Sequence, residues 1–237
     1  IMGADCSGVT GAVANNVAVP NGVVMVSPSA TSPGLTALKD KGYFFRTAPS
    51  DARQGEVLAD ILKSRNIMET AISYTNNDYG KGLAESFTAA FKKLGGKVSM
   101  TTAHEDGKAD YSAEVGALAS SGSKYLSVFG YADQGGKGII QASLDSGAFE
   151  NFIIGDGMIS DTLIKAIGKD LNFAAPQVGI GQGADVVRVH QFIFGTEHHG
   201  QRHRVGSDQR HLIGIVAGGQ TANQVGPGFS VRAPDIF

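Results

Sequence analysis

The sequence contains almost no cysteine, no tryptophan and no long apolar run. Cys6 is the only cysteine among 237 residues, which excludes an internal disulfide and a cysteine-rich zinc site. Because no stretch of about 18 consecutive apolar residues occurs, the sequence predicts no membrane-spanning helix. The first residues, IMGADCSG, lack the basic region and the apolar run of a signal peptide.

Charge is also scarce. Charged residues make up 18% of the chain, and the formal net charge is −2, which gives no electrostatic reason to expect nucleic acid or an anionic membrane as the partner. The 42% of hydrophobic residues is enough for one large core or two modest ones in a globular chain of this length. Small molecules and proteins therefore remain as the expected partners.

Lysine is absent from residues 172–237. The first 171 residues hold 12 Lys and 3 Arg, whereas the last 66 residues hold 5 Arg, five of the six His and 11 Gly. The helix and strand periods end abruptly near Asn172, without a linker. Three explanations are open: a divergent native segment, a disordered extension, or sequence not selected to fold with the rest, as after an out-of-frame junction. The abrupt change favours the last.

Before that boundary, short β-branched runs alternate with amphipathic helical patterns. The pattern predicts strands at 23–26, 70–74, 98–102, 125–129 and 152–154, and helices at 11–19, 33–38, 51–64, 111–120, 134–146 and 160–168, with a further helix that carries Leu83 to Leu94 and stops at Gly95. Alternation at this spacing predicts parallel strands with crossover helices on both faces. The expected fold class is α/β.

Ligands of open parallel sheets bind beyond the carboxyl ends of the strands. The segments expected at that edge carry hydroxyls, aromatic rings and one carboxylate: Ser7, Ser29, Ala30, Thr31, Tyr79, Gly130, Tyr131, Asp156 and Gly157. Ser7 and Thr31 stand beside helix starts, whose free N–H groups suit a carboxylate. Asp156 lies between glycines and suits an ammonium group. Together they predict a site for a zwitterion, with the tyrosines as its walls.

Each of these residues also has a plainer explanation. Ser7 and Thr31 are equally suited to be helix caps, and Asp156 is equally suited to form a turn. Tyr79 and Tyr131 are equally suited to be ordinary loop or packing aromatics. Six positions at one edge of a sheet favour the binding site over these separate explanations.

Other functions fit the sequence less well. The run Gly179–Gly183 lacks the preceding strand and the full spacing of a dinucleotide-binding fingerprint. His198, His199 and His203 stand among glycine and arginine, which favours a solvated stretch over a metal site. No G-x-S-x-G motif is present, which disfavours a hydrolase. We therefore expect neither catalysis nor a cofactor.

Residues 1–171 resemble the branched-chain amino-acid binding proteins, the type I periplasmic solute receptors of ABC transporters. The order and spacing of several stretches carry the resemblance: Cys6-Ser7, Val26 to Thr36, Phe45-Arg46-Thr47, Asp78 to Leu83, Phe129-Gly130-Tyr131 and Gly155-Asp156-Gly157. The resemblance implies a two-lobed fold that closes on a small aliphatic amino acid, a periplasmic location and a membrane permease as partner. The same fold used as the ligand-sensing part of a signalling protein is the alternative.

The resemblance also implies a role for each site residue. Ser7 and Thr31 would hold the ligand carboxylate, and the backbone carbonyl of Ser29 would accept from the ammonium. Asp156 would neutralise the ammonium, and Tyr79 and Tyr131 would line the cleft. Many relatives have glutamate at the position of Asp156, so the shorter side chain leaves room for a different ligand placement.

The expected division of the chain follows from the same resemblance. Residues 1–46 would belong to the first lobe, 47–51 to the crossover and 51–171 to the second lobe, with 172–237 as an atypical tail. Compared with the family, segments before Ile1 and after Leu171 are missing, including a partner for Cys6. We therefore expect weak binding, or none, from these residues alone.

Overall fold

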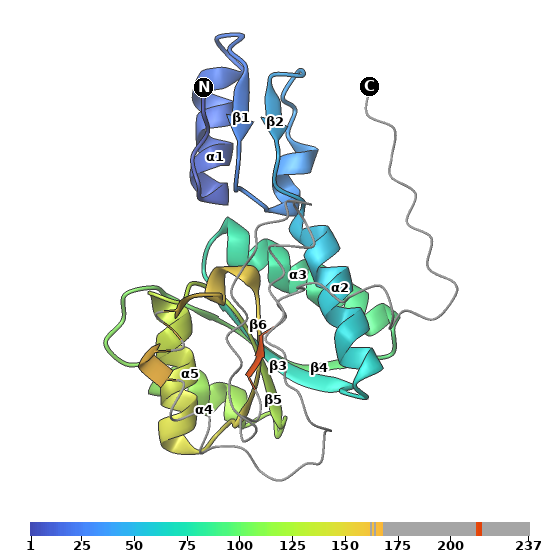
Figure 1. Ribbon diagram of the computed structural model, residues 1–237, viewed down its shortest axis with the longest axis vertical. Helices are drawn as coiled ribbons and strands as arrows, with labels where there is room; N and C mark the ends of the chain where they lie inside the picture. The colour runs from blue at the N-terminus through green and yellow to red at the C-terminus, as the bar shows by residue number, and fades with distance from the viewer. Residues whose placement is uncertain (162, 164, 168–211, 215–237) are drawn as a thin grey trace.

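The protein is described by a computed structural model, which places residues 1–161, 163, 165–167 and 212–214. The fold is α/β, as predicted: all paired strands are parallel, in one sheet of two strands and one of five (Figure 1). No helix in the described part of the chain is both long and apolar enough to cross a membrane.

The described elements follow one another in strict strand and helix alternation after the first helix. In chain order they are α1 (Ser7–Val13), the π-helical η1 (Ala14–Ala18), β1 (Met25–Ser27), the 3₁₀ helix η2 (Pro33–Ala37), β2 (Phe44–Arg46), α2 (Asp51–Ser64), β3 (Glu69–Thr75), α3 (Asp78–Lys93), β4 (Lys97–His104), α4 (Ser112–Ala119), β5 (Tyr125–Phe129), α5 (Gly135–Ser146), β6 (Asn151–Ile154), the 3₁₀ helix η3 (Asp156–Met158) and β7 (Leu212–Gly214).

The first unit of the fold contains α1, η1, β1, η2 and β2 (Figure 1). Its two strands pair in parallel, with Met25 opposite Phe44, and Met2 adds a parallel bridge to Val26 on the other side of β1. Its small core joins the helical segment to the strands through six buried side chains: Ala14, Ala18, Met25, Ala30, Leu35 and Phe44.

The second unit is a five-stranded sheet in the order β4-β3-β5-β6-β7. In Figure 1, α2 and α3 cover one of its faces, and α4 and α5 cover the other. Side chains of β5 alternate between the two cores: Leu126 and Val128 pack with α4 and α5, whereas Phe129 packs with α2 and α3. This alternation is the two-residue period of a strand buried on both faces.

The strand order reverses direction beside β3. The chain first adds β4 on one side of β3 and then crosses to add β5 on the other side. The connections that leave β3 and β5 therefore diverge at the carboxyl edge of the sheet, which is where open α/β sheets bind ligands. The segments at this position begin at Asn76 and at Gly130.

Several predicted boundaries were wrong at the starts of elements. The first strand begins at Met25, because hydrogen bonds to β2 start there, and Val23 and Val24 are exposed. The first helix begins at Ser7 rather than at Gly11. Tyr79 lies within the first turn of α3, not in a loop before it. The short strand β7 was not predicted.

Packing of α2 on α3 depends on Gly55. A Cβ atom at this position would lie 2.6 Å from the Phe87 backbone nitrogen. We therefore expect Gly55→Ala to lower the free energy of unfolding by about 1–3 kcal/mol, despite the higher helix propensity of alanine. Gly116 in α4 has open space around it, so Gly116→Ala should raise stability by about 1 kcal/mol. Equal free energies of unfolding for the two variants, measured with urea, would contradict the close contact between Gly55 and the Phe87 backbone.

Candidate functional site

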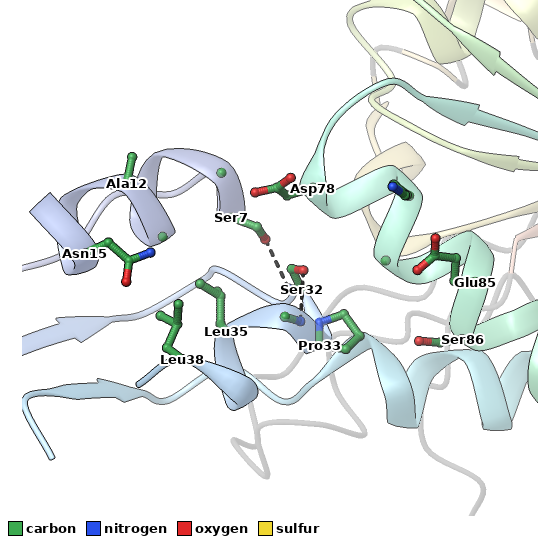
Figure 2. Close-up of a pocket in the computed structure, with 15 residues that line it drawn as sticks. Ser7, Ala12, Asn15, Ser32, Pro33, Leu35, Leu38, Asp78, Glu85 and Ser86 are labelled. Atoms are coloured by element: carbon green, nitrogen blue, oxygen red, sulfur yellow. Dashed lines mark hydrogen bonds between the residues drawn. The ribbon is translucent and has the colours of Figure 1, made fainter. Parts of the chain in front are cut away.

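A groove of about 540 Å³ lies between the first unit and α3 (Figure 2). The first unit contributes Ser7, Ser32 and Pro33 to its wall, and α3 contributes Asp78 and Gly82. The two units approach closely here, because a Cβ atom on Gly82 would lie only 2.8 Å from Pro33 Cδ. The groove therefore marks the seam between the two units.

Ser7 organises the loop after β1. Its Oγ accepts hydrogen bonds from the backbone nitrogens of Thr31 (3.2 Å) and Ser32 (3.1 Å). Neither Ser7 nor Thr31 is a helix cap: Cys6 precedes α1 without a side-chain bond, and Ser32 caps η2 by accepting from the Gly34 nitrogen. Capping therefore does not explain their positions, and the bonds from Thr31 and Ser32 to Ser7 join the start of α1 to the loop after β1.

The rest of this loop is tied down within the first unit. Ser29 Oγ donates to the Asp5 carbonyl (3.2 Å) and to the Asp5 carboxylate. The buried Ala30 donates its N–H to Ser27 Oγ (3.1 Å). The Arg46 guanidinium donates to the Ser32 carbonyl at 2.8 Å. The loop is therefore held from both sides before any ligand contacts it.

Tyr79 and Asp156 form the centre of the second group of predicted residues. The Tyr79 hydroxyl donates to Asp156 Oδ1 at 2.6 Å and accepts from the Gly157 nitrogen at 3.0 Å. Burial, with Tyr79 only 5% exposed, raises the pKa of its hydroxyl well above the ordinary value, so it acts as a neutral donor. Tyr131 stacks on Tyr79, with ring centroids 5.2 Å apart.

Glycine is required beside this pair for reasons of space. A Cβ atom on Gly157 would lie 2.5 Å from the Gly130 carbonyl oxygen and 2.8 Å from the Tyr79 hydroxyl oxygen. The segment after β6 thus passes directly against the segment after β5 and against α3. This close approach brings three separate elements to one point at the carboxyl edge of the sheet.

Tyr131 lies on the exposed side of the stack. It is half-buried, and burial raises the pKa of its hydroxyl to about 12; the neighbouring Cys6 thiol raises the pKa as well, whereas the Asn77 side chain lowers it. Tyr131 therefore faces the first unit at the start of α1. The exposed Cys6 has no disulfide partner among the described residues.

Asp51 is a further site residue, and the sequence did not single it out. It begins α2, is 1% exposed, and its backbone nitrogen donates to the Thr31 carbonyl at 2.9 Å. Burial, then the charge of Asp156, raises the pKa of Asp51 to about 8, although the Thr31 side chain and Arg46 lower it. The Asp51 carboxyl is thus enclosed by groups from both units. Its phase with the buried Leu58 and Leu62 could have indicated that it faces inward.

The predicted site residues thus fall into two groups. One group lies at the loop after β1, which carries Ser29, Ala30 and Thr31 and is held by Ser7. The Ser29 hydroxyl bonds to Asp5, within the first unit. Tyr79, Tyr131, Asp156 and Gly157 form one connected group. Of all eight, only Ser7 borders the groove of Figure 2. Asp51 lies between the groups, because Thr31 and Asp156 both influence its carboxyl.

No metal-binding site is indicated among the described residues. Residues 1–161, with the few described residues beyond them, contain no group of three His, Cys, Asp or Glu that could hold a metal ion. The stretch Gly179–Gly183 and the histidines His198, His199 and His203 lie outside the described residues. The described site therefore offers hydroxyls, carboxylates and aromatic faces, which bind polar organic molecules.

Comparison with known proteins identifies the family. Residues 1–199 match the family described as the receptor family ligand binding region. The chain belongs to this family. The match spans most of the chain and continues past Asn172, into the segment whose composition differs from the rest.

Related members of this receptor family are named as Leu/Ile/Val-binding proteins. The chain is 37% identical over 180 residues to Leu/Ile/Val-binding protein homolog 3 of Brucella melitensis, a match that covers 71% of this chain and 47% of that protein. It is 34% identical over 170 residues to Leu/Ile/Val-binding protein BraC3 of Rhizobium johnstonii, covering 68% and 46%. The chain thus spans about half the length of these relatives.

The raised pKa of Asp51 makes the stability of the protein depend on pH. The unfolded carboxyl ionises near its ordinary pKa of 3.8 and the folded one near 8, so stability falls as pH rises between these values. From pH 5 to pH 8 we expect a loss on the order of 3–4 kcal/mol, which Asp51→Asn should remove because an amide does not titrate. The cost of burying the amide is the same at both pH values.

Urea unfolding at the two pH values measures this difference. Asp60 is an exposed residue on the same helix, so Asp60→Asn should lose as much stability as the unmodified protein. An identical pH dependence for Asp51→Asn and the unmodified protein would show that Asp51 is already ionised in the folded state at pH 5.

Proposed function

We propose that this protein is the substrate-binding component of an ABC transporter. In this proposal it binds a small aliphatic amino acid, with no enzymatic activity, by closing two lobes over the ligand. The relatives named as Leu/Ile/Val-binding proteins support the ligand class. A periplasmic location and a membrane permease as partner belong to the same proposal.

The observation that carries the proposal is the arrangement of opposite chemistries around the first turn of α2. Ser7, which holds this loop, and Thr31 within it carry hydroxyl groups, which suit a carboxylate. Asp156 retains acceptor positions beyond the one used by Tyr79, which suit an ammonium group. A zwitterion needs both, and an aliphatic side chain would pack on the stacked tyrosines.

We assign each predicted residue a role on this basis. Ser7 and Thr31 hold the carboxylate, and the segment Ser29–Ala30 offers backbone groups to the ammonium. Asp156 neutralises the ammonium, while Gly157 allows the ligand to approach the backbone. Tyr79 and Tyr131 form the wall of the cleft.

The two units would act as lobes. We propose that residues 1–46 belong to the first lobe, 47–51 to the crossover and 51–171 to the second lobe. A ligand that contacts both lobes is bound more tightly by the closed form, so binding shifts the population toward closure. Hinge motion of this kind needs only a few residues that change backbone angles, as the crossover provides.

Binding of leucine tests the proposed function directly. Titration calorimetry on the protein that contains residues 1–237, with leucine, isoleucine, valine and a panel of polar amino acids, should show heat of binding for the aliphatic set. Asp156→Ala should weaken leucine binding roughly a hundredfold or more, because the ammonium loses its charge partner. The exposed Asp133 is a matched control, and Asp133→Ala should bind normally. Equal affinity in both variants would remove Asp156 from the site.

Closure of the lobes has its own test at Gly82. A leucine side chain at this position would collide with Pro33 and hold the units apart. Gly82→Leu should therefore prevent the decrease in radius of gyration that leucine causes, and should weaken leucine binding at least tenfold. Ala89 is exposed on the same helix, so Ala89→Leu adds a side chain of equal size without this collision. Small-angle X-ray scattering with and without leucine measures this change. An equal decrease in radius of gyration for Gly82→Leu and the unmodified protein would show that closure does not need the Gly82–Pro33 contact.

A further inference from the structure

His104 is the last residue of β4, and its ring is buried against the segment that carries Tyr131. The residue is 1% exposed. A Cβ atom on Gly130 would lie 3.0 Å from His104 Nε2, and one on Gly135 would lie 2.7 Å from His104 Cδ2. The ring therefore packs against both ends of the short segment from Gly130 to Gly135, and Tyr131 lies within that segment.

The two nitrogens of this ring have different surroundings. Nδ1 shares a hydrogen bond of 2.8 Å with Ser73 Oγ. Nε2 is buried and has no hydrogen-bond partner among the described residues. A neutral ring that donates from Nδ1 leaves only a lone pair at Nε2. Protonation of His104 would place an N–H at Nε2, beside Gly130 and without an acceptor, which is costly for a buried polar group.

The titratable groups around His104 and the neighbouring Tyr111 ring belong to the segment after β4 and to α4: Glu105, Asp106, Lys108, Tyr111 and Glu114. Burial lowers the pKa of His104, and the three carboxylates raise it by less. Lys108 forms an ion pair with Glu114. Ser73 and Gly135, which contact the ring from β3 and α5, do not titrate. The folded protein thus favours the neutral ring, and its stability falls as pH drops below the ordinary pKa of 6.5.

Asp106 fixes one end of the segment that carries Tyr131. Its Oδ1 accepts from the Gly135 nitrogen at 3.1 Å, and its Oδ2 accepts from Thr75 Oγ1 at 2.7 Å. The Gly135 end is therefore tied to the end of β3. A change at the ring nitrogen Nε2 acts instead on the Gly130 end, which directly precedes Tyr131.

The same segment is joined to Gly157. The Ala132 nitrogen donates to the Gly157 carbonyl at 3.1 Å. A Cβ atom on Gly157 would lie 2.5 Å from the Gly130 carbonyl oxygen. Movement of Gly130 away from His104 would therefore displace Tyr131 and disturb Gly157 as well.

We propose that His104 is a positioning residue for Tyr131 and that its protonation weakens ligand binding. This inference rests on the proposed function, because Tyr131 forms the wall of the same amino-acid site. The neutral ring holds Gly130 where Tyr131 stacks on Tyr79. The imidazolium displaces this segment, so it favours the protein without ligand. The proton and the amino acid then oppose each other, and acid promotes release of the ligand.

Leucine affinity as a function of pH tests this role. Titration calorimetry on the protein that contains residues 1–237 should show a loss of affinity from pH 7.5 to pH 5.0. This loss should be at least about threefold larger than in His104→Gln, whose amide does not titrate. The carboxyl groups of the site titrate in both proteins, so the difference isolates His104. Equal pH dependence in the two proteins would overturn its role.

A measurement on the unmodified protein does not depend on how the variant folds. The NMR signal of the His104 ring, assigned through the backbone signals of β4, reports its pKa directly. That pKa should be lower with saturating leucine than without leucine, because each ligand reduces the affinity for the other. An unchanged pKa with leucine bound would overturn the role of His104 and leave the proposed function intact. Absence of binding for every amino acid would overturn both.

Discussion

The hydrogen bond from the Tyr79 hydroxyl to Asp156 is the contact on which the site depends. It joins the first turn of α3 to the segment after β6, and the Gly157 nitrogen completes it from the other side. The bond forms across the end of β5, because β5 lies between β3 and β6 in the sheet. One buried hydroxyl thus fixes the spacing of three strand ends, and the stacked Tyr131 follows from the same geometry.

The seam between the two units depends on a second constraint: it leaves no space for a side chain at Gly82. Gly82 and Pro33 meet with no room for another carbon atom. Asp51 is consequently enclosed by groups that belong to different units. A carboxyl group in such a place responds to any change in how the units meet, because its environment changes with them.

The sequence predicted the elements best where packing repeats. The helix at 51–64 and the strand at 125–129 have the predicted bounds, because their apolar residues recur with the helical and strand periods and are buried in that phase. The first residues of helices and strands were harder to predict. Ser7 and Tyr79 stand in the first turns of helices, where no apolar period has yet begun, so the pattern placed both in preceding loops.

The site was predicted as a set of residue types, but not as a set of contacts. The tyrosines and Asp156 were expected at one edge of the sheet, and they do form one group. Asp51 was not predicted as a site residue, because tertiary neighbours, here Thr31 and Asp156, decide whether an acid is buried. Leu212–Gly214 escaped for a similar reason, since three residues become a strand only through pairing with β6.

The place of β3 inside its sheet has a consequence for synthesis of the chain. It is the first strand of its sheet to leave the ribosome, yet both of its neighbours, β4 and β5, follow it. Until they arrive, both edges of the segment Glu69–Thr75 are unpaired, which promotes association between chains. Both edges of β3 are thus paired only after the chain has been made as far as β5.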